Sequence, residues 1–198
     1  MISDKLLRNY NASLQKIKKG ETIFNKREHA NFYYQVKSGE IKMNNYSADG
    51  NEFIQSIFYE AQSFGEPPLF ADIVYPAGAE AIVDSEVYKL PKARFHQLLK
   101  ENPKVHFKIT EVLSLRLYYK AIIASTMSSE EPGKRILKLF DYLKKYVHKL
   151  EDQDHFEVDL KRQQIADLTG LRVETVIRAC KSLEEKAEIK ILKRKIIR

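Results

Sequence analysis

The sequence contains almost no cysteine and no long apolar run. Cys180 is the single cysteine among 198 residues, which excludes a disulfide framework and a zinc site or iron–sulfur cluster held by cysteines. Because Cys180 falls on an apolar helical stripe, we interpret it as a buried small hydrophobic residue rather than a redox switch. No apolar stretch approaches the roughly 18 residues that span a membrane, and residues 1–8 lack the apolar core of a secretion signal. We therefore expect a cytoplasmic protein with no membrane partner.

The sequence also lacks the side-chain clusters of an enzyme. His29 is the one histidine in the strand-rich region, and the others are scattered over later segments: His96, His106, His148 and His155. A cupin-type metalloenzyme, whose β-roll would suit the first half of the chain, needs histidine and carboxylate ligands that lie close together. No nucleophile–base pair and no glycine-rich phosphate loop is present. We therefore expect no metal, no cofactor and no enzymatic activity.

Basic residues are concentrated in the last third of the chain. Residues 1–133 hold 17 Lys and Arg against 16 Asp and Glu, a net charge of +1. Residues 134–198 hold 17 against 11, a net charge of +6. A basic module joined to a nearly neutral one favours a polyanion as partner of the basic part. The alternative is a solvated basic surface, because an excess of this size on a small domain is modest.

Residues from about 14 to 91 have the pattern of short β-strands. Runs rich in aromatic and β-branched residues occur at residues 32–36, 40–43 and 53–58. Turn signals separate such runs at residues 19–20, 38–39 and 49–50. The Asp49-Gly50 pair is a strong hairpin signal. Several short strands at this spacing predict a β-sandwich or roll, which we assign as a double-stranded β-helix, or jelly roll.

The pattern becomes helical after Pro91. A short helix is predicted at residues 95–100, and Pro103 opens a long helix that ends near residue 127. Two apolar stripes run along the long helix: Val105, Ile109 and Val112, and Leu113, Leu117 and Ala121. One side would pack on the roll and the other on the same helix of a second copy. The alternative is a single helix wrapped within its own domain.

A hinge and a further helix follow. Residues 128–133 are polar and end in Pro-Gly, which predicts a helix break and a domain boundary. Apolar residues at helical spacing then predict another amphipathic helix: Ile136, Leu139, Phe140 and Leu143. Strands followed by helices make the fold class α+β.

Residues 162–178 have the pattern of a helix-turn-helix, with Gly170 at the corner and the small Ala166 where the helices approach. The second helix carries a core stripe of Val176, Cys180, Leu183 and Ala187. Glu174, Arg178 and Lys181 lie on the opposite side, which is free to enter a major groove. There Arg178 can donate two hydrogen bonds to guanine and Glu174 can accept one from cytosine. An amphipathic helix with a solvated face is the alternative, but the glycine-cornered partner helix and the basic tail favour DNA.

The last ten residues predict a basic hairpin. Apolar residues 189–192 and 196–197 flank Lys193, Arg194 and Lys195. Such a wing would lie on DNA phosphates and contribute affinity without sequence recognition. A short edge hairpin with solvated lysines is an equally good interpretation.

These motifs resemble those of the Crp/Fnr family of bacterial transcription regulators, and the resemblance covers nearly the whole chain. Residues 19–21, 36–41 and 64–66 are similar to the family's cyclic-nucleotide-binding-type roll, residues 104–127 to its dimerisation helix, and residues 162–178 to its DNA-binding motif. The resemblance implies a winged helix-turn-helix and a homodimer on a two-fold-symmetric site in double-stranded DNA. Its half-sites would lie roughly 34 Å apart.

The resemblance also implies domains and DNA contacts. The domains are a sensor roll at residues 1–103, a dimerisation helix and hinge at residues 104–131, and a winged helix-turn-helix at residues 132–198. The implied DNA contacts are Arg162, Gln163, Arg172, Val173, Glu174, Thr175, Ile177, Arg178, Lys181, Lys193, Arg194 and Lys195. Glu174 and Arg178 resemble the principal base contacts. Val173 resembles the residue that the oxygen-sensing branch has at this position, whereas the cAMP-responsive branch has Arg there. Ile177 stands where the oxygen-sensing branch commonly has a polar residue.

The sensor departs from the family's cAMP-binding pattern. Pro76 and Ala77 stand where an Arg-Ser pair holds the cyclic phosphate, and Lys120 and Ala121 stand where Thr and Ser contact adenine. We infer that cAMP is not a tight ligand. The candidate effector pocket comprises Phe64, Gly65, Glu66, Pro76, Ala77 and Lys120. The expected partners are double-stranded DNA, a second copy of the chain, RNA polymerase and an unidentified small-molecule effector. The alternative function is a small-molecule binding module whose helix-turn-helix makes protein contacts only.

Overall fold

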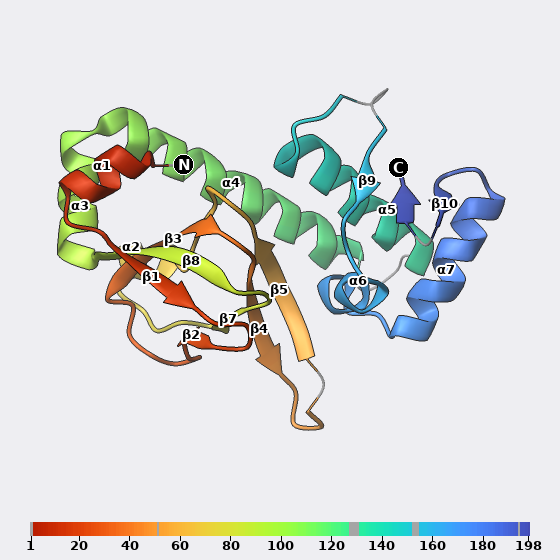
Figure 1. Ribbon diagram of the computed structural model, residues 1–198. Coiled ribbons are helices and arrows are strands. Elements are labelled where there is room, and N and C mark those ends of the chain that lie inside the picture. Colours follow the sequence, from red (N-terminus) through yellow and green to blue (C-terminus); the bar gives the residue numbers. More distant parts are fainter. Residues whose placement is uncertain (1, 51, 127–130, 152–154, 194) are drawn as a thin grey trace. The chain divides into compact units, whose positions relative to one another are not determined.

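The computed structural model describes residues 2–50, 52–126, 131–151, 155–193 and 195–198 (Figure 1). The chain forms two compact units, residues 1–113 and 114–198. Within the described ranges, no helix combines the length and apolar character that crossing a bilayer requires.

The N-terminal unit is built on two antiparallel four-stranded sheets, with strand orders β1-β8-β3-β6 and β2-β7-β4-β5. The strands are β1 (Ser13–Ile17), β2 (Thr22–Phe24), β3 (Phe32–Ser38), β4 (Ile41–Tyr46), β5 (Glu52–Phe58), β6 (Ser63–Phe64), β7 (Gly78–Ala81) and β8 (Ser85–Pro91). The chain passes repeatedly from one sheet to the other, as a roll requires (Figure 1). The predicted jelly roll is therefore confirmed.

The β4–β5 hairpin forms where its turn residues predict it. The pairing runs from Ile41 opposite Phe58 to Tyr46 opposite Glu52. Gly50 closes the turn with a φ of 77°, a left-handed conformation that glycine adopts without a steric cost.

Aromatic rings fill the interior of the roll. Phe24 stacks on Tyr75 with 3.7 Å between ring centroids, and Tyr34 stacks on Phe64 at 5.4 Å. All four side chains are buried, and Phe58 packs beside Phe64. Such rings bury a large apolar area each, so this cluster supplies much of the hydrophobic stabilisation of the roll.

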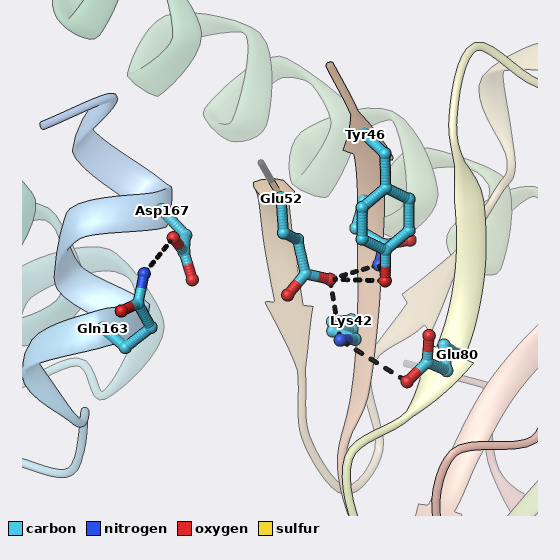
Figure 2. A network of polar contacts seen from close by, with 7 residues as sticks. Lys42, Tyr46, Glu52, Glu80, Gln163 and Asp167 are labelled. Carbon is cyan, nitrogen blue, oxygen red and sulfur yellow. Dashed lines mark hydrogen bonds and ion pairs between the residues drawn. The ribbon is translucent and has the colours of Figure 1, made fainter. Parts of the chain in front are cut away.

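A polar network ties three strands of one sheet together (Figure 2). The Lys42 ammonium on β4 lies 2.7 Å from a carboxylate oxygen of Glu52 on β5 and 3.4 Å from one of Glu80 on β7. The Glu52 carboxylate also accepts hydrogen bonds from Asn44 and Tyr46. The charged side chains are at most about a quarter exposed, so this network is partly shielded from solvent.

Four helices accompany the strands: α1 (Asp4–Asn9), α2 (Pro67–Ala71), α3 (Lys92–Glu101) and α4 (Pro103–Thr126). The predictions of α3 and of a long helix beginning at Pro103 are confirmed, whereas α1 and α2 were not predicted. On α4, Val105, Ile109 and Leu113 pack against the core of the N-terminal unit. The assignment of Leu113 to the second stripe was wrong, because it follows Ile109 by four residues and so shares its face.

The C-terminal unit contains the second half of α4 and a three-helix arrangement with a small sheet. Its further elements are α5 (Pro132–Tyr142), a π-helical turn (Leu143–Val147), β9 (Glu157–Val158), α6 (Arg162–Thr169), α7 (Val173–Glu185), β10 (Lys190–Leu192) and β11 (Lys195–Ile197). The sheet has the order β10-β11-β9, so the predicted hairpin forms and gains a third strand that was not predicted. Tyr119 on α4 stacks on Tyr142 with 3.9 Å between centroids.

Three local predictions in this unit need correction. Pro132 and Gly133 form the first turn of α5 rather than a hinge, because proline is well tolerated at a helix start. Residues 128–130 of that predicted hinge lie outside the described residues. Ala187 does not belong to the core stripe, because α7 ends at Glu185 and Ala187 is exposed with a φ of 58°. Lys195 lies within β11 rather than in the turn before it.

Candidate nucleic-acid interface

The corner between α6 and α7 forms at Gly170, as predicted. Gly170 has a φ of 66°, and its N–H donates to the carbonyl of Ala166 at the end of α6. The N–H of Leu171 donates to the same carbonyl at 3.0 Å. These bonds satisfy a carbonyl that the helix end would otherwise leave unpaired, so the corner is sharp and well defined.

A buried arginine holds this corner against α5. The Arg135 guanidinium donates a hydrogen bond of 3.1 Å to the carbonyl of Thr169, the last residue of α6. The Thr169 hydroxyl in turn donates to the carbonyl of Ile165 at 2.6 Å. Sequence reasoning missed Arg135, although a basic residue directly before the apolar positions Ile136, Leu139 and Phe140 is a usable signal.

The outer face of α7 has the predicted orientation. Glu174, Arg178 and Lys181 are exposed, and Ile177 is exposed at the edge of this face. Val176, Cys180 and Leu183 are buried on the opposite side. Burial raises the pKa of the Cys180 thiol, which stays neutral, and the prediction of a buried Cys180 is confirmed.

The beginning of α7 and an adjacent groove extend this face. Arg172, the residue before α7, is exposed, while Val173 and Thr175 in the first turn are half-buried. A groove of about 510 Å³ lies between α7 and the start of α5, and its lining includes Lys134, Thr175, Arg178, Ser182 and Lys186. Lys134, Ser182 and Lys186 were not predicted, although Ser182 and Lys186 follow Arg178 at spacings of four residues.

The first turn of α6 presents Arg162 and Gln163. Arg162 is half-buried and Gln163 is exposed. The Gln163 amide nitrogen donates to a carboxylate oxygen of Asp167 at 2.8 Å (Figure 2). A carboxamide has two N–H donors, so a phosphate contact by Gln163 has to use the second one.

The wing offers fewer unpaired charges than the sequence suggests. Lys193 is exposed in the turn with a φ of 47°, and Arg194 lies outside the described residues. The Lys195 ammonium lies 2.5 Å from a carboxylate oxygen of Glu157 on β9. This hydrogen bond from Lys195 to Glu157 raises the pKa of Lys195. The positive charge of Lys195 is therefore partly neutralised before any DNA phosphate approaches.

The predicted effector residues of the roll are largely core residues. Phe64 and Ala77 are fully buried, and the buried Glu66 carboxylate accepts a hydrogen bond from the Ser63 hydroxyl. A Cβ atom at Gly65 would lie 3.2 Å from the rings of both Phe24 and Tyr75. Pro76 is exposed, and Lys120 lies on α4 in the C-terminal unit. A ligand between these roll side chains would have to separate packed rings.

The described residues contain no cluster of three or more histidine, cysteine or carboxylate side chains able to hold a metal ion. The chemistry available on the C-terminal unit is hydrogen bonding and charge on an exposed helix face, which suits a polyanion with readable base edges.

Two family models match the chain. The cyclic nucleotide-binding domain matches residues 14–102, and the Crp-like helix-turn-helix domain matches residues 134–198. The cAMP-activated global transcriptional regulator CRP of Haemophilus influenzae is 25% identical over 173 residues, which cover 87% of this chain and 77% of that protein. The protein of the same name from Pasteurella multocida is 26% identical over 165 residues, which cover 83% of this chain and 79% of that protein.

Some similarities concern only part of the chain. Lysophospholipase NTE1 of Phaeosphaeria nodorum is 26% identical over 98 residues, which are half of this chain but 6% of that enzyme. A likeness of this extent concerns one domain of a much longer protein.

Solved structures share the fold. FixK2 from Bradyrhizobium japonicum superposes with a TM-score of 0.74 at 21% identity, over 94% of this chain and 91% of that one. The c-di-GMP responsive regulator CLP of Xanthomonas campestris superposes with a TM-score of 0.74 at 19% identity, over 98% of both chains. Because the roll, the Crp-like helix-turn-helix and the regulators aligned with most of the chain agree, we conclude that the chain belongs to the Crp/Fnr family of DNA-binding transcription regulators.

Proposed function

We propose that the protein acts as a homodimer that recognises a two-fold-symmetric DNA site through the exposed face of α7. The observation that carries this proposal is the outward orientation of Glu174 and Arg178 beside a corner that Gly170 and Arg135 fix. Arg178 would donate two hydrogen bonds to guanine O6 and N7, and Glu174 would accept one from cytosine N4.

The surrounding polar residues would contact the DNA backbone. These are Arg162, Gln163, Arg172, Thr175, Lys181, Lys193, Arg194 and Lys195, with Val173 at the helix start close to the bases. Phosphate contacts of this kind fix the register of α7 in the groove and make affinity depend on salt. Lys134 and Lys186 add two further cations beside Arg178.

The second copy would pack on α4. Phe107, Leu117 and Tyr118 on this helix are 78%, 69% and 53% exposed, so they leave apolar area that association could remove from water. Phe107, Ser114, Leu117 and Ala121 follow one another at spacings of seven, three and four residues. This is the spacing of a two-helix seam, so the same helix of a second copy is the occupant that fits.

A small molecule or partner at the roll would control DNA binding by favouring one arrangement of the two recognition helices. We propose that this effector is not cAMP, because Pro76 and Ala77 can supply neither a charge nor a hydroxyl to a cyclic phosphate. RNA polymerase is the expected partner at promoters. We propose no enzymatic activity for the chain.

Selection of bound duplexes from a random DNA pool, with and without cell extract, tests the function. We expect a palindromic consensus, and an affinity for it that falls steeply as salt rises. A change in affinity or in the selected sequences when extract is added would reveal an effector. Enrichment of no sequence, or an affinity that does not depend on salt, would overturn the proposal.

A further inference from the structure

Ile177 is an apolar side chain on an otherwise charged helix face. It is 52% exposed, and it is the one large apolar residue of α7 that is exposed, in a helix that the structure describes completely. Its exposed companions on the face are Glu174, Arg178 and Lys181. An isoleucine in this position keeps apolar surface in contact with water and so contributes little hydrophobic stabilisation to the free protein.

The helix geometry places Ile177 at the edge of the DNA-facing side. At 3.6 residues per turn, it lies about 60° around the axis from Glu174 and about 40° from Lys181. In the opposite sense around the axis, Ile177 lies about 60° from Cys180 and about 100° from Val176, so it stands between the DNA-facing side and the packed core stripe. Because Ile177 is 52% exposed, about half of its surface is free of the core and lies beside Glu174 and Lys181, at the edge of the side that would enter the groove.

We infer that Ile177 recognises the 5-methyl group of a thymine in each half-site. This inference rests on the proposed function, which brings α7 into the major groove. Thymine is the only base that offers a methyl group there, whereas cytosine and adenine offer amino groups. An isoleucine against an amino group would remove it from water without replacing its hydrogen bond, so Ile177 also disfavours those bases. Thymine is thus selected next to the base pairs that Glu174 and Arg178 contact.

Replacement of thymine by uracil isolates this contact, because it removes one methyl group and leaves base pairing intact. The probe is a palindromic duplex selected from the random pool by the wild-type protein, with each thymine replaced in turn by uracil in both half-sites. Burial of one methyl group corresponds to about a fourfold change in affinity, so two half-sites give roughly fifteenfold. We expect a loss of this size at one thymine position.

Two variants identify the side chain responsible. With Ile177→Ala, the difference between thymine and uracil at that position should disappear, whereas Ile177→Val should keep most of it because its branched methyl groups remain. Leu192→Ala is the matched control, since Leu192 is 60% exposed in the same unit but lies on β10. This control should leave the thymine preference unchanged. Cooperative unfolding of each variant verifies that it is folded.

The outcomes separate this inference from the proposed function. Equal wild-type affinity for every uracil-substituted duplex, or the same loss in Ile177→Ala as in the wild type, overturns the inference alone. A wild-type protein that enriches no sequence overturns both. A loss at one position that depends on Ile177 but not on Leu192 supports the thymine contact.

Discussion

The roll and the outer face of α7 use their charged side chains in different ways. In the roll, Lys42 is held by the partly shielded carboxylates of Glu52 and Glu80, and more exposed ion pairs join Lys18 to Asp84, Lys37 to Asp4 and Lys92 to Asp72. On α7, Glu174, Arg178 and Lys181 are exposed and form no ion pair with any residue that the structure describes. A shielded pair such as Lys42 and Glu52 contributes more to the stability of the fold than exposed pairs do, whereas unpaired charges on a fixed face are available to a partner. Substitutions in the two units should therefore change different measured quantities.

The largest effect is expected from Arg178→Ala. Loss of a two-hydrogen-bond contact to guanine should weaken specific binding by about 1–3 kcal/mol in each half-site. The free energy of unfolding should stay within about 0.5 kcal/mol of the wild type, since the side chain is exposed. Fluorescence anisotropy with the selected duplex measures the first quantity and urea denaturation the second. Unchanged specific affinity would favour a helix-turn-helix that makes protein contacts only.

Arg135→Leu concerns a charged side chain of the C-terminal unit that is buried, in contrast to the exposed charges of α7. Removal of its hydrogen bond leaves the Thr169 carbonyl without that donor and should cost about 1–3 kcal/mol of unfolding free energy. DNA affinity should fall as well, since the α6–α7 corner loses a support. The neighbouring exposed substitution Lys134→Leu is the control for stability. Equal stability of the two variants would show that Arg135 does not fix the corner.

Glu52→Gln should change the pH dependence of stability and leave DNA binding intact. Burial acts to raise the pKa of Glu52, but hydrogen bonds from Lys42 and Asn44 outweigh it and hold the pKa below its usual value. A lowered carboxylate pKa stabilises the folded state above the unfolded value of about 4.3, and this stabilisation is lost as pH falls through the folded value. The stability difference between wild type and variant should therefore shrink as pH falls below about 5. The exposed substitution Glu60→Gln is the control for the loss of one surface carboxylate.

The smallest effect is expected from Glu157→Gln, which would leave the Lys195 ammonium without its ion-pair partner and available to a DNA phosphate. Removal of the carboxylate that neutralises Lys195 should strengthen binding to any duplex about two- to fivefold at low salt, with the gain fading as salt rises. In a Lys195→Ala background the same substitution should bring a smaller gain, since the pairing is already gone. Identical gains in both backgrounds would mean that Glu157 repels DNA directly.

The features that could be predicted from the sequence are those that depend on residues close together in the chain. The Asp49-Gly50 turn, the helix start at Pro103 and the glycine corner at Gly170 depend on residues close together in the chain, and all three were predicted. So was the outward face of α7, because helical periodicity alone separates Glu174 and Arg178 from the core stripe.

Long-range pairings were not accessible to that reasoning. Arg135 and Thr169 are 34 residues apart, and Glu157 and Lys195 are 38 apart, so no periodicity links them. The role of Phe64 depends on which rings the two sheets bring together, and the structure packs it against Tyr34 and Phe58. The DNA contacts themselves remain predictions.

The stack of Phe24 on Tyr75 gives the roll an intrinsic optical reporter. The chain has eleven tyrosines and no tryptophan, so its fluorescence and near-ultraviolet dichroism come from tyrosine and phenylalanine rings. A compound that enters the interior of the roll has to part rings whose centroids are 3.7 Å apart, and their spectra would change without any label. Screening compound libraries by tyrosine signal is therefore a direct test for the proposed effector.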